Sequence, residues 1–125
     1  MVQLSTYKTT TESITVASTS ADASATLLYT CPAKHSATID FLHISNNNAG
    51  AKKANIQFYN TTGTAYHNII KAHSIAANSS YNVLDNSQMH LQAGDQILVY
   101  AETTNTLEAT ISVRVIVFFH RNCSF

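Results

Sequence analysis

The sequence predicts an all-β protein, built as a single β-sandwich or jelly roll of about eight strands. Short segments in which apolar and polar residues alternate recur along the chain, and clusters of Asn, Gly, Asp and Ser separate them roughly every ten residues. No window has the apolar spacing of an amphipathic helix. The 125 residues are enough for one domain with a core of its own.

The chain begins with a Ser/Thr-rich stretch that has no apolar periodicity. We interpret residues 1–13 as an irregular N-terminal arm that orders on a partner, and residues 14–125 as the β-sandwich domain. A short strand is expected at residues 14–17. A second one, at residues 25–31, ends at Pro32, because proline cannot donate a ladder hydrogen bond.

The strand expected at residues 38–45 is apolar on both faces. Two rows alternate along it, one with Ile39, Phe41 and His43 and the other with Leu42 and Ile44. We therefore expect this strand to be covered on both sides. Further strands are expected at residues 54–60, 66–73, 81–84 and 97–102, with a hairpin loop at 61–64 and a Gly94-Asp95 turn before the last of them.

The last expected strand carries the clearest signal, an apolar face at period two formed by Leu107, Ala109, Ile111, Val113, Val115, Val117 and Phe119. Ile116 and Phe118 interrupt its polar side, so something beyond its own sheet should bury that end. We expect a homo-oligomer, a trimer, with an interface formed by Ile116, Phe118, Phe119 and Phe125.

The composition limits the partners. Seven basic residues balance seven acidic ones, and only 11% of the residues are charged. Such a chain has no electrostatic reason to bind nucleic acid or an anionic membrane. Ser, Thr and Asn make up about a third of the chain. This neutral surface of hydroxyl and amide groups suits a protein that packs against neighbours.

The N-terminus lacks the apolar stretch of a signal peptide, and the longest apolar run, residues 115–119, is too short to span a bilayer. We expect synthesis in a cytoplasm, where Cys31 and Cys123 would be reduced thiols. The two could still pair if their strand ends meet, but burial as small apolar side chains is the simpler expectation.

The sequence predicts neither an enzyme nor a bound cofactor or metal. His67 and His73 share a strand face, but positions six apart lie about 20 Å apart, too far to share one ion. Asp85 and Asp95 flank His90 in the sequence, yet no Ser or Cys stands in a nucleophile motif. For Asp95 we expect a structural role, in which it accepts hydrogen bonds from its own turn.

One stretch of the chain resembles a known family. Residues 28–39, LYTCPAKHSATI, are followed by His43-Ile44-Ser45-Asn46 and later by residues 91–97, LQAGDQI. These residues resemble small β-sandwich virion proteins of tailed bacteriophages, over roughly residues 25–117. The family often has Gly where this chain has Lys34 or His35.

The resemblance implies a virion protein without enzymatic activity or cofactor, made in the host cytoplasm. We expect a capsid decoration or cement protein that binds the major capsid protein and stabilises the shell. A tail or baseplate component is the first alternative. The second is a carbohydrate-binding jelly roll, with a sugar site drawn from Tyr59, Tyr66, Tyr81, Tyr100, Asn60, Asn68 and Asn82. The absence of Trp counts against the lectin, and these tyrosines could equally pack at sheet edges.

Overall fold

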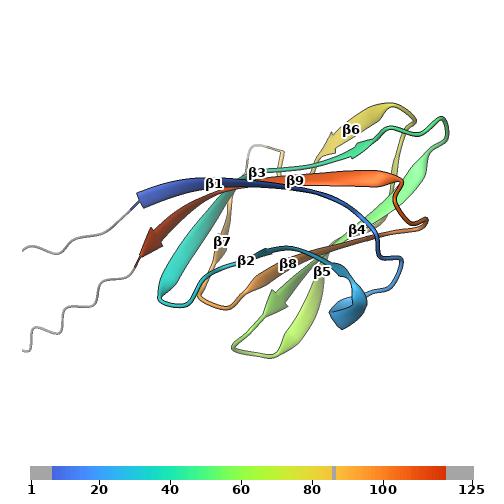
Figure 1. Cartoon of the computed structure of the whole chain (residues 1–125). Coiled ribbons are helices and arrows are strands. Elements are labelled where there is room, and N and C mark those ends of the chain that lie inside the picture. Colours follow the sequence, from blue (N-terminus) through green and yellow to red (C-terminus); the bar gives the residue numbers. More distant parts are fainter. Residues whose placement is uncertain (1–6, 86, 118–125) are drawn as a thin grey trace, which may run out of the picture.

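The computed structural model describes residues 7–85 and 87–117, nearly all of them in strands or the turns between strands. Nine strands and one short 3-10 helix are present in this part of the chain (Figure 1). In chain order they are β1 Tyr7–Thr15, η1 Asp22–Ser24, β2 Thr26–Thr30, β3 His35–Asn46, β4 Lys52–Asn60, β5 Ala65–Ile75, β6 Ser79–Asn82, β7 Met89–Leu91, β8 Gln96–Ala101 and β9 Leu107–Val117.

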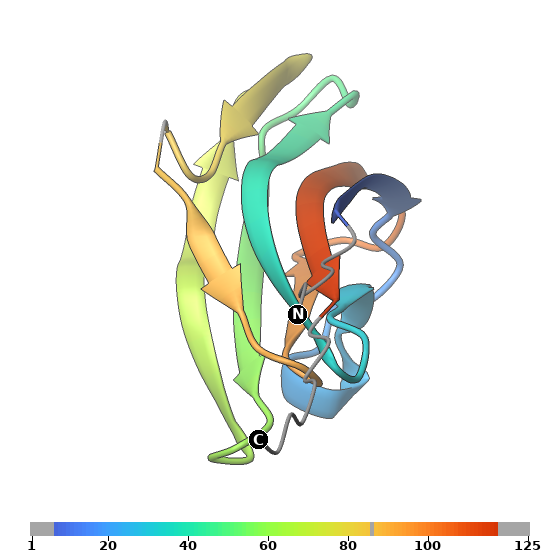
Figure 2. The ribbon, with the colours of Figure 1, turned by 90° about the vertical axis from the view of Figure 1, so that its left-hand side faces the viewer.

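The strands form two antiparallel sheets that pack face to face. One has the order β1-β9-β3-β6, with β7 also paired to β3, and the other has the order β2-β8-β4-β5. Most successive strands alternate between the two sheets, which is the winding of a jelly roll. The predicted fold class is confirmed. The strand number rises to nine because β6 and β7 are separate short strands that follow one another along β3 (Figure 2).

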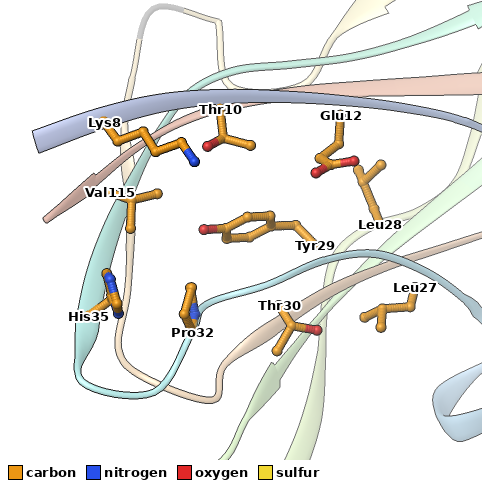
Figure 3. A pocket seen from close by; sticks show the side chains of 10 residues that line it. All are labelled: Lys8, Thr10, Glu12, Leu27, Leu28, Tyr29, Thr30, Pro32, His35 and Val115. Carbon is orange, nitrogen blue, oxygen red and sulfur yellow. The ribbon is translucent and has the colours of Figure 1, made fainter. Parts of the chain in front are cut away.

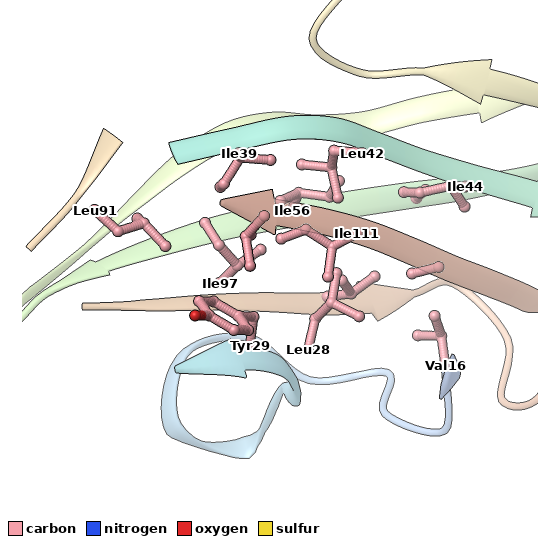
Figure 4. Close-up of a cluster of buried hydrophobic side chains, with 14 of the residues drawn as sticks. Val16, Leu28, Tyr29, Ile39, Leu42, Ile44, Ile56, Leu91, Ile97 and Ile111 are labelled. Carbon is pink, nitrogen blue, oxygen red and sulfur yellow. The ribbon is translucent and has the colours of Figure 1, made fainter. Parts of the chain in front are cut away.

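The core lies between the sheets and is almost entirely aliphatic (Figure 4). Five members of the predicted period-two row of β9 are buried, namely Leu107, Ala109, Ile111, Val113 and Val115. Side chains from β3, β4 and β8 meet them from both sheets, with Ile39, Leu42, Ile44, Ile56, Ile97 and Val99 all fully buried. The alternation in the sequence therefore identifies the buried face of β9 correctly.

Strand β3 differs from the prediction because it contains a bulge. Its register against β9 shifts between Ile39 and Phe41, so the extra residue reverses the direction of every later side chain. Ile39, Leu42 and Ile44 all point into the core, whereas Phe41 is 39% exposed on the outer face. The expectation that β3 is covered on both sides is therefore wrong. Because of the bulge, Ile39 from one predicted row and Leu42 and Ile44 from the other share the buried face of β3.

The N-terminal segment is also more ordered than the sequence predicts. Residues 7–13 belong to β1, which pairs along its whole length with β9, from Tyr7 opposite Ile116 to Thr15 opposite Glu108. The prediction of an irregular arm is wrong for these residues, and residues 1–6 lie outside the described part. The strand has no apolar periodicity because much of it lies at an exposed sheet edge. Threonine is common at such positions, since it favours the extended backbone and its hydroxyl group is compatible with solvent.

Residues 18–25, which contain η1, fold over the outer face of the second sheet. The backbone N–H of Asp22 donates to the Gln57 side-chain oxygen (2.7 Å), and the Gln57 amide donates to the Asp22 carboxylate (2.9 Å). Gln57 is only 4% exposed. These two bonds satisfy a polar side chain that would otherwise be costly to bury.

Candidate functional site

Of the four predicted interface residues, the structure places one. Ile116 is half-buried near the end of β9, on the outer face of its sheet, opposite Tyr7 of β1 and Ser36 of β3. Phe118, Phe119 and Phe125 lie outside the described residues. The trimer that these four residues would form stays a prediction.

The outer face around Ile116 is a hydroxyl-rich surface. Beyond Ile116 along β9, the outward positions are Arg114, Ser112, Thr110 and Glu108, and β1 sets Thr9, Thr11, Ser13 and Thr15 beside them. Two cross-strand hydrogen bonds link the rows: Thr11 to Ser112 (3.3 Å) and Ser13 to Thr110 (3.1 Å). We call the outward side chains of β1, β9 and β3 the hydroxyl face.

One ion pair crosses the hydroxyl face. Arg114 of β9 donates twice to Asp40 of β3, from Nε (2.6 Å) and from a terminal nitrogen (3.0 Å). Gln88 donates to the same carboxylate (2.8 Å). The hydrogen bond from Arg114, together with the one from Gln88, lowers the pKa of Asp40. The charges of this pair offset each other, which keeps this part of the face electrically neutral.

Next to the ion pair the hydroxyl face carries an exposed aromatic ring. The ring of Phe41 stacks on His43 with centroids 4.0 Å apart and planes inclined by 14°. The β3 bulge produces this stack, because it turns Phe41 outward beside His43. An exposed ring that is supported from one side is a suitable anchor for a protein contact.

A groove opens between β1 and β2, where the two sheets part at one edge of the sandwich (Figure 3). Its volume is about 470 Å³. Lys8, Thr10 and Glu12 of β1 line one wall, and Tyr29 of β2 extends between them and the core. Burial raises the pKa of Tyr29 to about 12, with smaller contributions from Cys31 and Glu12. This groove was not expected from the sequence, in which the only signal for it is the polar row at alternate positions of β1.

The opposite edge of the sandwich is closed by aromatic packing. His73 of β5 and Tyr81 of β6 stack with ring centroids 3.9 Å apart. His67 instead lies beside Phe58, at 6.3 Å between ring centroids. The two histidines therefore have separate aromatic partners. Within residues 7–85 and 87–117, no group of three or more His, Cys, Asp or Glu side chains could hold a metal ion.

Two of the residues considered for catalysis, Asp95 and His90, make hydrogen bonds that hold neighbouring segments of the fold together. The Asp95 carboxylate is 4% exposed and accepts hydrogen bonds from the backbone N–H of Thr61 (3.1 Å) and of Gln92 (2.9 Å). The structural role predicted for Asp95 is confirmed. The His90 ring pairs with the hydroxyl of Thr38 (3.0 Å). Cys31 is buried, as expected, and Cys123 lies outside the described residues.

The tyrosines considered for sugar binding are dispersed. Tyr59 and Tyr66 form a tilted pair with centroids 4.7 Å apart at the paired ends of β4 and β5. Tyr81 instead packs on His73 at the closed edge of the sandwich. Tyr100 lies on β8, opposite Asn55. Only the first two tyrosines come together as a candidate platform.

The comparisons with known proteins show the fold and no family. No family model matches the chain, and no curated protein sequence matches it. A chain of Bacillus endospore appendages, described as a novel family of disulfide-linked pili, is 13% identical over 94% of this chain and 93% of its own length, with a TM-score of 0.49.

Two further solved structures are similar. A chain of the T13 viral particle of IBDV is 8% identical over 91% of this chain and 31% of its own length, with a TM-score of 0.53. The globular domain of zebrafish complement 1qA protein is 11% identical over 91% and 98% of the two chains, with a TM-score of 0.37. This protein therefore spans about a third of the IBDV chain and has a β-sandwich fold that also occurs in a viral particle.

No helix in the described part of the chain is long and apolar enough to cross a membrane.

Proposed function

We propose that this protein is a non-enzymatic structural component of a bacteriophage virion, a decoration protein that binds the major capsid protein on the outer shell and stabilises it. The observation that carries this proposal is the hydroxyl face. It presents rows of Ser and Thr around the internally paired Arg114 and Asp40, with the Phe41–His43 stack as its apolar anchor.

Such a face suits docking on another protein surface. Hydroxyl groups both donate and accept, so they can match many backbone groups of a partner. Because the Arg114–Asp40 pair brings its own counter-charge, burying it costs less than burying a lone charge would. The sequence resemblance to tailed-phage virion proteins and the fold shared with an IBDV particle chain both support this proposal.

The test compares particles of the virus that carries this gene with particles from which the gene has been deleted. Particles without the protein should release their genome at a lower temperature, with tails still attached. Adding the purified protein back should restore the native release temperature. The contrary result is that particles lacking the protein keep full shell stability but lose their tails or fail to adsorb to the host. That result would refute the decoration role and assign the protein to the tail or baseplate.

A variant in the middle of the hydroxyl face tests the docking surface. Ser112→Arg adds a long unpaired charge beside Thr11 on the outer face of the sheet. We expect this variant to fold normally, because the site is outside the core, and to lose binding to the deleted particles, because the charge would be buried on docking. Thr62→Arg, in the exposed turn between β4 and β5, is the matched control and should bind like the native protein. Equal binding of both variants would exclude this face.

The Tyr59–Tyr66 pair favours glycan binding as a second candidate function. Two adjacent rings form the kind of apolar platform on which a sugar can stack, and the Asn68 side chain accepts a hydrogen bond from Gln57 nearby (3.3 Å). Binding of native protein to a glycan array, lost in Tyr66→Ala, would support this candidate. An array without signal would eliminate it.

A further inference from the structure

Strand β1 ends its sheet with an unpaired edge. It is paired to β9 on one side, and on its other side no described strand continues the sheet. Lys8, Thr9, Thr11, Glu12 and Ser13 are all exposed along this edge. A free strand nine residues long is a template for pairing with another strand.

The backbone register determines which residues of β1 offer their peptide groups to a partner. The N–H of Val16 donates to the carbonyl of Leu107 (2.8 Å), on the β9 side. Because peptide groups alternate in direction along an antiparallel strand, the even-numbered residues of β1 bond to β9. The odd-numbered residues, among them Thr9, Thr11 and Ser13, therefore direct their N–H and C=O groups to the open edge.

The side chains on the even-numbered positions carry opposite charges placed symmetrically. Lys8 and Glu12 stand two positions either side of Thr10, and all three line the groove on the inner side of β1 (Figure 3). Within the described residues, neither Lys8 nor Glu12 has an ion-pair partner. An edge with this pattern is complementary to a second copy of itself that runs antiparallel.

We propose that two copies of this chain pair through β1 across a two-fold axis at Thr10. In this register Lys8 of each copy lies opposite Glu12 of the other, and Thr9 lies opposite Thr11. The odd-numbered pairs exchange backbone hydrogen bonds, two for each pair. The even-numbered pairs are the non-hydrogen-bonded kind, in which opposite side chains come closest, so both Lys8–Glu12 ion pairs form directly.

Charge selects this register from its neighbours. Only registers that set odd-numbered residues opposite odd-numbered ones can form the backbone bonds. Moving the partner by one such step in either direction sets Lys8 opposite Thr10 or opposite Ile14, and Glu12 loses its cation. In the selected register the two β1-β9-β3-β6 sheets join into one continuous sheet, and the two grooves face each other across the axis.

Charge reversal tests the proposal on the full-length protein. Sedimentation velocity over a concentration series should show a dimer for the native chain, weakened by salt. Lys8→Glu and Glu12→Lys should each raise the dissociation constant roughly ten- to a hundredfold, because each sets like charges opposite each other twice. The double variant Lys8→Glu/Glu12→Lys should regain native affinity.

Two controls distinguish a loss of this interface from a general effect of net charge and from unfolding. Lys71→Glu changes the net charge as Lys8→Glu does, but on exposed β5, and should dimerise like the native chain. Thermal melting of every variant shows whether it is folded. A native chain that stays monomeric at high micromolar concentration refutes the proposal, and so does a trimer that is insensitive to the β1 variants.

The register itself has two direct readouts. Thr10→Cys, in a chain with Cys123 replaced by Ser, should cross-link to its own copy on oxidation, whereas Thr9→Cys should not. Hydrogen exchange at the amides of Thr9, Thr11 and Ser13 should slow as concentration rises. The amides of Thr10 and Glu12, already bonded to β9, should change much less. Cross-linking at Thr9 instead of Thr10 would contradict the two-fold axis at Thr10.

Discussion

The side chain of Asn55 on β4 holds the backbone of Ala72 on β5, with the Ala72 N–H donating to the Asn55 amide oxygen at 2.7 Å. Ala72 has a φ of 52°, in the left-handed region that an alanine rarely adopts, at a point where the β4–β5 register is irregular. The Asn55 amide nitrogen also donates to the carbonyl of Tyr100 on β8 (3.3 Å). One buried side chain thus connects three strands.

Replacing Asn55 with Leu should destabilise the fold. The Ala72 N–H and the Tyr100 carbonyl would each lose a partner beside a side chain only 7% exposed, and the expected loss is about 1–3 kcal/mol of unfolding free energy. Urea denaturation measures it. The control Asn47→Ala, at an exposed position after β3, should change stability by less than about 0.5 kcal/mol. An Asn55→Leu variant that loses no more unfolding free energy than this control would show that the Asn55 hydrogen bonds do not stabilise the fold.

The turn before β8 supplies a second prediction. Gly94 has a φ of +87°, and an added Cβ would lie 2.9 Å from the Thr61 hydroxyl oxygen. Gly94→Ala should therefore cost about 1–3 kcal/mol, from backbone strain and from this contact.

Thr61→Ala separates these two causes of the Gly94→Ala cost. It removes the hydroxyl that donates to the Gly94 carbonyl and that the new methyl group would meet. In this background Gly94→Ala should cost less, because the two closest contacts of the new methyl group are gone, and the strain of the positive φ and a 3.3 Å contact with the Cβ of residue 61 remain. A double-mutant cycle on unfolding free energies measures the difference. An unchanged cost would assign the whole effect to the backbone.

Much of the fold could be predicted from the sequence, and the reason is the period of two. The apolar row from Leu107 to Val115 has only one arrangement that buries it in a sandwich, and the structure has that arrangement. The Gly94-Asp95 turn could be predicted for a similar reason, since few residues tolerate a positive φ. Both signals are local in the chain.

What could not be predicted depends on contacts between distant residues. The bulge before Phe41 shows only in the register of β3 against β9. Gln57 and Asn55 read as an outward polar row of β4, yet both are buried, because residues 18–25 cover the first and the irregular β4–β5 pairing uses the second. The groove needs two strand edges that only the fold brings together.

The conformation of the turn between β2 and β3 could not be predicted from the residues that form it. Lys34 has a φ of 63°, in the left-handed region that glycine favours and that a lysine rarely adopts.

Tyr29 supplies a prediction about pH. Burial, with smaller effects from Cys31 and Glu12, raises its pKa in the folded protein from 10.0 to about 12. The folded state therefore holds this proton more tightly than the unfolded state does. The stability associated with Tyr29 is fully present below pH 10 and is lost as the pH rises toward about 12.

Ultraviolet absorbance of the phenolate form measures this titration. The native protein should show a late ionisation of Tyr29 that Tyr29→Phe removes, and the same variant should flatten the fall of unfolding free energy above pH 10. Tyr66→Phe, in the Tyr59–Tyr66 pair, is the control and should keep the late step. If Tyr29→Phe leaves that step in place, the groove does not raise the pKa of Tyr29.

Truncation from the N-terminus tests whether β1 is part of the domain. Deleting residues 1–13 removes most of β1 and leaves β9, from Thr110 to Ile116, without a partner on the side that β1 occupies, while its pairing with β3 remains. Each lost ladder bond contributes on the order of 1 kcal/mol, so we expect a loss of at least about 3 kcal/mol and a clearly lower melting temperature. Deleting residues 1–6 leaves every described strand whole and should cost much less.

Had residues 1–13 been an arm outside the domain, the two truncated proteins would melt together, at the temperature of the native chain. Thermal unfolding of the three proteins side by side distinguishes the two cases, because only an integral β1 predicts a sharp drop between the shorter and the longer deletion.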